Sequence, residues 1–99
     1  MIYLDNAATT KVNEKVLESM MPYFSEIYCN PSAAYSFATK GRIAIEEARN
    51  HAAKLIGASD MEIYFTSGGS ESDNWAIKAA AESFSDKGKH IITTKIEHH

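Results

Sequence analysis

The feature that most constrains the fold is a strand, glycine turn, helix and strand in succession in the second half of the chain. Residues 61–66 are rich in β-branched and aromatic side chains and are short enough to form a strand. A Ser-Gly-Gly-Ser turn follows at 67–70, and apolar residues at helical spacing occupy 75–84. Residues 89–94 read as a second buried strand. This order predicts an α/β fold containing a strand-helix-strand unit.

Helical spacing of apolar residues predicts two further helical regions in the first half. The first covers about 12–27, with Asn13 at its N-cap, and Pro22 should kink it or divide it in two. The second runs from about 36 to 56, and Gly57 fits the left-handed position that ends many helices. Its buried stripe is expected to be small, with larger apolar residues beside it: Ala44, Ala48, Ala52, Ile45, Leu55 and Ile56.

Composition narrows the class of protein. A chain of 99 residues is long enough for at most one ordinary domain, and 44% hydrophobic with 23% charged residues is typical of a globular protein. A net charge of -3 gives no reason to expect nucleic acid, and no apolar run is long enough to span a membrane. The single cysteine, Cys29, excludes an internal disulfide framework and a cysteine zinc site. We therefore expect a cytoplasmic protein without a metal site. Cys29 itself is expected to be a small buried residue.

The turn at 67–70 is the strongest local candidate for a binding site. Glycines let a ligand approach the backbone, and the free N–H groups of the first helical turn attract anions such as phosphate. Hydroxyls of Ser67 and Ser70 add donors, whereas a carboxylate from Glu71 would repel phosphate. The alternative is an ordinary helix start, with Ser70 and Asp73 as a capping box, and such turns are common without ligands.

Histidines follow the second predicted strand, at residues 98 and 99. If the two strands are parallel, this end lies at the same sheet edge as the glycine turn, where ligands of open α/β sheets bind. An imidazole there could stack on a flat cofactor ring or transfer protons, and the alternative is a surface histidine at a frayed end. Residues 5–10 and 30–32 are small polar loops that either border a substrate or simply turn the chain.

Taken together, five stretches in order resemble the N-terminal quarter of the cysteine desulfurases, in the class V aminotransferase branch of fold-type I pyridoxal-phosphate (PLP) enzymes. The stretches are 3–10, 30–32, 46–49, 62–74 and 90–98. The resemblance implies that residues 13–99 begin the large domain and that 1–12 belong to the small domain or the pocket edge. Because the chain stops directly after an apolar segment, we expect it to be a piece of a longer protein.

The resemblance also implies roles for individual residues. Gly69 and Ser70 would bind the PLP phosphate, and His98 would stack on the pyridine ring and assist proton transfer as a catalytic residue. Asn6, Ala7 and Asn30 would border the pocket for L-cysteine. The sequence departs from the family in three places: Ser70 replaces the usual threonine, Tyr35 a common histidine and Ala38 a common glycine.

The family mechanism also needs a lysine that holds PLP, an aspartate on the pyridine nitrogen and a cysteine on a mobile loop. No residue of this chain matches them, so we expect the chain alone to be inactive and to bind PLP weakly or not at all. The complete enzyme is expected to be a homodimer that passes sulfur to an iron–sulfur scaffold or another acceptor protein. The alternatives are a selenocysteine lyase or other class V transferase, and a standalone strand-helix-strand module that binds an anion or a partner protein.

Overall fold

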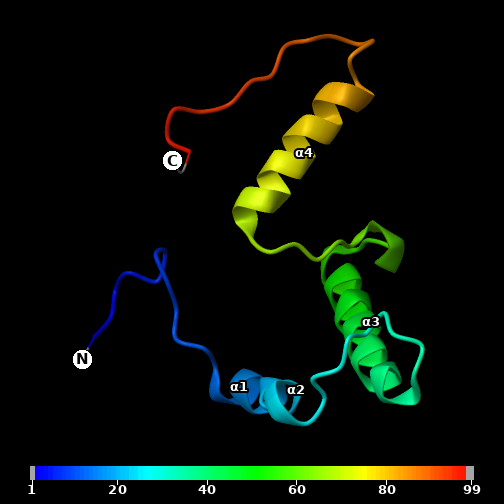
Figure 1. The fold of residues 1–99 in the computed structure, drawn as a ribbon. Coiled ribbons are helices and arrows are strands. Elements are labelled where there is room, and N and C mark those ends of the chain that lie inside the picture. The colour runs from blue at the N-terminus through cyan, green and yellow to red at the C-terminus, as the bar shows by residue number, and fades with distance from the viewer. Residues whose placement is uncertain (1, 98–99) are drawn as a thin grey trace. The chain divides into compact units, whose positions relative to one another are not determined.

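The computed structural model describes residues 2–97 and consists of helices joined by loops. The elements are α1 (Glu14–Met20), α2 (Pro22–Ser25), α3 (Ser36–Ile56), the 3-10 helix η1 (Asp60–Glu62) and α4 (Gly69–Ser83) (Figure 1). The chain divides into two compact units, one ending at Ile63 and the other beginning at Tyr64. None of the helices in the described part combines the length and the apolar composition that a bilayer span requires.

The predicted first helix is present and is divided where the proline predicts. The side chain of Asn13 accepts a hydrogen bond from Lys15 N at 2.9 Å, which satisfies an N–H group that the helix itself leaves unpaired. α1 ends at Met20, and Pro22 occupies the first position of α2. A proline is tolerated there because its missing N–H is not needed in the first turn.

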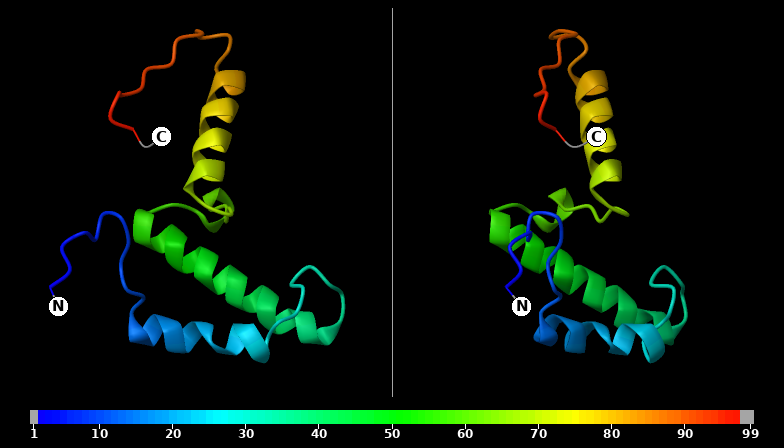
Figure 2. Two further views of the ribbon diagram at one scale, coloured as in Figure 1. Left: turned by 60° about the vertical axis from the view of Figure 1, so that its left-hand side comes forward. Right: turned by 90° about the vertical axis from the view of Figure 1, so that its left-hand side faces the viewer.

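α3 has the bounds that the sequence predicts and dominates the first unit. After α2 the chain turns back into this helix (Figure 2). Gly57 ends it with φ 71°, a left-handed conformation that glycine adopts without steric cost, and its N–H donates to the carbonyl of Ala53. Both helix-ending predictions, a stop after Ile56 and a left-handed Gly57, are confirmed.

The buried face of α3 differs from the predicted stripe. Ala38, Gly41 and Ala53 are its buried residues, whereas Ala48 and Leu55 are exposed. The sulfur of Cys29 lies only 2.9 Å from the point where a Cβ on Gly41 would stand, so the segment before α3 covers its first turns. The periodicity correctly predicted that the buried residues of α3 are small, but it predicted the wrong residues. The segment that covers the helix is not regular secondary structure, so helical spacing does not indicate which side it covers.

One hydrogen bond holds the end of η1 against α3, and an ion pair within α3 orients the arginine that donates it. The guanidinium of Arg49 donates to the carbonyl oxygen of Ile63, and its Nε lies 3.4 Å from Glu46 Oε2. Ser59 and Glu62 form a capping box at the start of η1, in which Ser59 N donates to Glu62 Oε2 at 2.7 Å. These bonds fix the chain where it leaves the first unit.

The second unit is built around α4. Tyr64 packs edge-on against Trp75, with ring centroids 5.2 Å apart, so the segment before the helix folds back onto its second turn. The helix ends at Ser83, and backbone N–H groups of residues 84, 85, 87 and 88 close the turns that follow. The helix predicted between the two strand segments is therefore present.

The predicted strands are not present. Within residues 2–97 no segment forms a strand, and residues 61 and 62 belong to η1. A strand is defined by hydrogen bonds to a neighbour, and no backbone hydrogen bond joins 63–66 to 89–94 in the described part of the chain. Neither segment therefore has a neighbouring strand among residues 2–97.

Candidate functional site

The candidate site is the turn that opens α4. Gly69 and Ser70 are the first two residues of the helix, as the phosphate-binding prediction requires. The first backbone bond of the helix is Ser72 N to Gly68 O at 3.2 Å. The N–H groups of residues 69, 70 and 71 therefore have no acceptor among the described residues. Three neighbouring donors at the positive end of a helix dipole form a site for an anion.

Glu71 bonds backwards across this turn. Its Oε2 accepts from the N–H of Ser67 at 2.6 Å and from the Ser67 hydroxyl at 2.7 Å. The hydroxyl bond, and after it the backbone bond, hold the pKa of the Glu71 carboxyl below its ordinary value, because both favour the charged form. The alternative interpretation, a capping box of Ser70 and Asp73, is wrong, because α4 begins at Gly69 and Ser70 lies inside its first turn.

A second set of hydrogen bonds ties the two sides of the turn together. The hydroxyls of Thr66 and Ser72 are 2.7 Å apart, and both lie within hydrogen-bond distance of the Gly68 carbonyl, at 3.2 and 3.3 Å. Asn74 donates to the carbonyl of Ser70 at 2.8 Å. The sequence analysis missed this network. The only signal in the sequence is the spacing of side chains across the Gly-Gly pair: Ser67 and Glu71 are four positions apart, and Thr66 and Ser72 are six positions apart.

The turn fits the phosphate of PLP. A Cβ built on Gly68 or Gly69 would meet no atom within 4 Å, so the space over this backbone is open. The hydroxyl of Ser70 makes no hydrogen bond among the described residues and supplies a further donor. Open space, three N–H groups and one hydroxyl match a phosphate, which carries several acceptor oxygens.

The predicted substrate residues at the N-terminus lie in an exposed turn. Asn6 and Ala7 are the central residues of a turn closed by Ala8 N to Asp5 O at 3.1 Å. The Tyr3 hydroxyl donates to the same Asp5 oxygen at 2.9 Å. The turn leaves the side chain of Asn6 and the backbone of Ala7 accessible.

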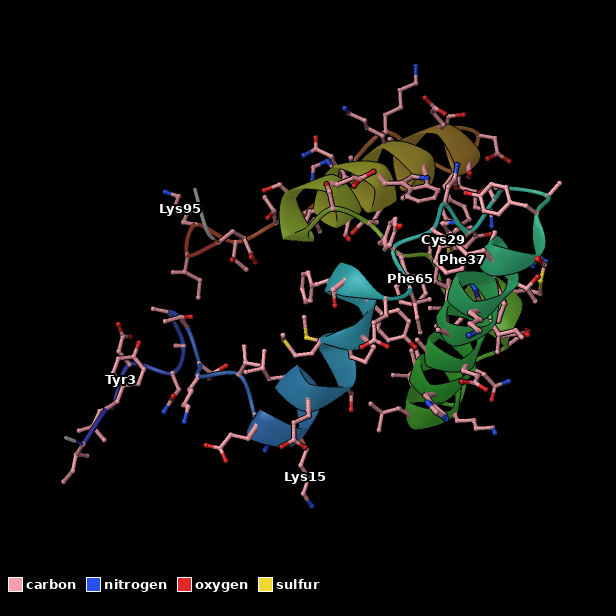
Figure 3. The ribbon with its side chains drawn as sticks, turned by 60° about the horizontal axis from the view of Figure 1, so that its bottom comes forward. Tyr3, Lys15, Cys29, Phe37, Phe65 and Lys95 are labelled. Atoms are coloured by element: carbon pink, nitrogen blue, oxygen red, sulfur yellow. The ribbon has the colours of Figure 1, made fainter. Side chains whose placement is uncertain are left out.

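Asn30 closes its own turn. Its side-chain oxygen accepts from Ser32 N at 3.0 Å and its carbonyl from Ala33 N at 3.1 Å. The side-chain nitrogen of Asn30 has no acceptor in the described part of the chain and remains a possible donor to a ligand. The neighbouring Cys29 is half-buried beside α3, where Figure 3 labels it with Phe37.

The predicted site residues are divided between the two units. Asn6, Ala7 and Asn30 belong to the first unit, and Gly69 and Ser70 to the second. His98 lies outside the described residues. No group of three or more histidine, cysteine, aspartate or glutamate side chains suited to a metal ion occurs in residues 2–97.

Residues 2–99 match the family model described as Aminotransferase class-V. Among the similar proteins, cysteine desulfurase IscS of Methanosarcina thermophila is 55% identical over 98 residues, which are 99% of this chain and 24% of that protein. Cysteine desulfurase IscS of Clostridium botulinum (strain Hall) is 53% identical, over 99% of this chain and 25% of the relative. The chain spans about a quarter of the length of the curated relatives it matches.

A solved structure described as a NifS-like protein is also similar to this chain. It superposes with a TM-score of 0.89 at 44% sequence identity. The match covers 98% of this chain and 27% of that chain. The likeness supports the N-terminal part of the fold-type I transferase fold over nearly the whole chain, although the strands predicted at 61–66 and 89–94 are not formed here.

Proposed function

Because this chain belongs to the class V aminotransferase family, we propose that it is the N-terminal quarter of a PLP-dependent cysteine desulfurase. The complete enzyme would convert L-cysteine to L-alanine. The bond between Cβ and sulfur breaks, the sulfur forms a persulfide with an enzyme cysteine thiol, and a proton replaces it on Cβ. The persulfide sulfur would then pass to an iron–sulfur scaffold or another acceptor protein.

One observation carries this proposal: the identity of 53–55% to proteins named cysteine desulfurase extends across 98 residues without being confined to one motif. The N–H groups of residues 69–71, which have no acceptor among residues 2–97, support a phosphate site at the residues that the resemblance assigns to it. The names of these relatives favour cysteine over selenocysteine as the substrate.

Within the complete enzyme, the residues of this chain would bind and orient the cofactor and the substrate. The amides of Gly69 and Ser70 and the Ser70 hydroxyl would hold the phosphate. Bound PLP would supply an electron sink for bond breaking at the substrate carbons. Asn6, Ala7 and Asn30 would border L-cysteine, and His98 would stack on the pyridine ring and move protons.

Three structural points complete the proposal. Segments 61–66 and 89–94 would become strands once downstream strands supply their hydrogen-bond partners. Residues 1–12 would belong to the small domain or the pocket edge and 13–99 to the large domain. The complete enzyme would be a cytoplasmic homodimer. Light scattering after gel filtration would measure its mass.

The test uses the full-length protein with PLP and L-cysteine. We expect a yellow protein that, in a single turnover without a sulfur acceptor, forms alanine and a protein persulfide in equal amounts. Changing His98→Ala should alter the PLP absorption spectrum and slow alanine formation by about 100-fold or more, because a positioned acid–base group contributes that much. A full-length protein that stays colourless with PLP contradicts the proposal, and an unchanged spectrum and rate in the variant would remove His98 from the site.

A further inference from the structure

Glu71 spans the turn before α4 and bonds to the residue on its far side. Both donors of Ser67, the N–H and the hydroxyl, are engaged by the same Glu71 oxygen, at 2.6 and 2.7 Å. The three free N–H groups of residues 69–71 take no part in this arrangement. The carboxylate therefore closes the turn without occupying the donors that a phosphate would need.

We infer that Glu71 is a positioning residue for the cofactor: its bonds to Ser67 hold the turn in its phosphate-binding conformation before PLP arrives. The inference rests on the proposed function, because it assumes that the phosphate binds at Gly69 and Ser70. The hydrogen bonds of Thr66 and Ser72 to the Gly68 carbonyl brace the same turn from the other side.

Two effects of the carboxylate oppose each other. Its negative charge repels phosphate, but the group is solvent-exposed, so water and salt screen the repulsion. Its bonds reduce the conformational freedom of a turn that contains two consecutive glycines. Less conformational entropy is then lost when the ligand binds. The same bonds lower the pKa of the Glu71 carboxyl, so the group stays ionised at neutral pH and also under mildly acidic conditions. We take preorganisation to be the larger effect.

The experiment measures binding of PLP and of pyridoxal, which lacks the phosphate, to the full-length apoenzyme by absorbance titration. We expect Glu71→Ala to raise the Kd of PLP about fivefold and to change the Kd of pyridoxal less than about twofold. Glu71→Gln keeps an oxygen acceptor for Ser67 and should stay within about twofold of the unchanged protein for both ligands. Glu82→Ala is the matched control, since it removes the same charge from an exposed position further along α4.

Two results would overturn the inference. If Glu71→Ala binds PLP as tightly as or more tightly than the unchanged protein, the carboxylate does not preorganise the turn and instead competes with phosphate. If the variant loses affinity for PLP and pyridoxal equally, Glu71 acts on general stability. The proposed phosphate site is tested separately: an unchanged protein that binds pyridoxal as tightly as PLP would contradict the site itself.

Discussion

A side chain on Gly41 would meet the sulfur of Cys29, which stands 2.9 Å from where its Cβ would be. We expect Gly41→Ala to lower the free energy of unfolding of the complete protein by about 1–2 kcal/mol through overpacking. In a Cys29→Ala background the same change should instead be neutral or stabilising by up to about 1 kcal/mol, because alanine favours a helix over glycine. Urea unfolding of the four proteins measures this, and equal effects in both backgrounds would show that the contact is not limiting.

Single residues with local roles were predictable from the sequence. Asn13 caps α1 and Gly57 ends α3 as expected, since a cap depends on a few neighbouring backbone groups. The Glu71 bond to Ser67 was not predicted, because α4 starts two residues earlier than the capping-box reading required. A shift of two positions changes which side chain reaches which N–H, and sequence patterns do not locate a helix end that finely.

At the scale of elements, Gly57 controls where α3 stops. Its φ of 71° lies in the left-handed region, which side chains with a Cβ adopt only at a cost. We expect Gly57→Ala to lower the stability of the complete protein by about 1 kcal/mol, and Gly57→Asn to cost less. Gly88→Ala is the matched control, because that glycine is exposed and has no positive φ. Thermal unfolding should separate them, and equal losses at both positions would argue against a conformational cause.

Helices and strands differed in how far the sequence predicted them. The bounds of α3 were predictable because every helical hydrogen bond joins residues four apart. The strands at 61–66 and 89–94 were predicted from composition alone, and a strand also needs a neighbour that composition does not supply. The candidate site was predictable as far as Gly69 and Ser70. The brace formed by Thr66 and Ser72 was not, because it depends on the path of the turn.

At the scale of the whole molecule, the described residues enclose very little apolar surface. Ala38 and Ala53 are the only buried hydrophobic residues among them, while Leu55 and Ile92 are each 87% exposed. Burial of apolar surface is the main driving force of folding, and isolated helices as short as α1 and α2 are marginal in water. The relatives are about four times longer, so the remainder of the protein is the expected cover for these side chains.

We therefore expect the 99-residue polypeptide alone to unfold in urea without a cooperative transition and to bind a hydrophobic dye, because many of its large apolar side chains are exposed. The full-length protein, measured alongside as the control, should show a sharp transition and little dye binding. Mixing the polypeptide with the separately expressed remainder should restore part of that cooperativity together with PLP binding. A cooperative transition of the polypeptide alone, with saturable phosphate binding, would instead favour an independent module. Cooperative unfolding is expected only of a chain that forms its own packed core.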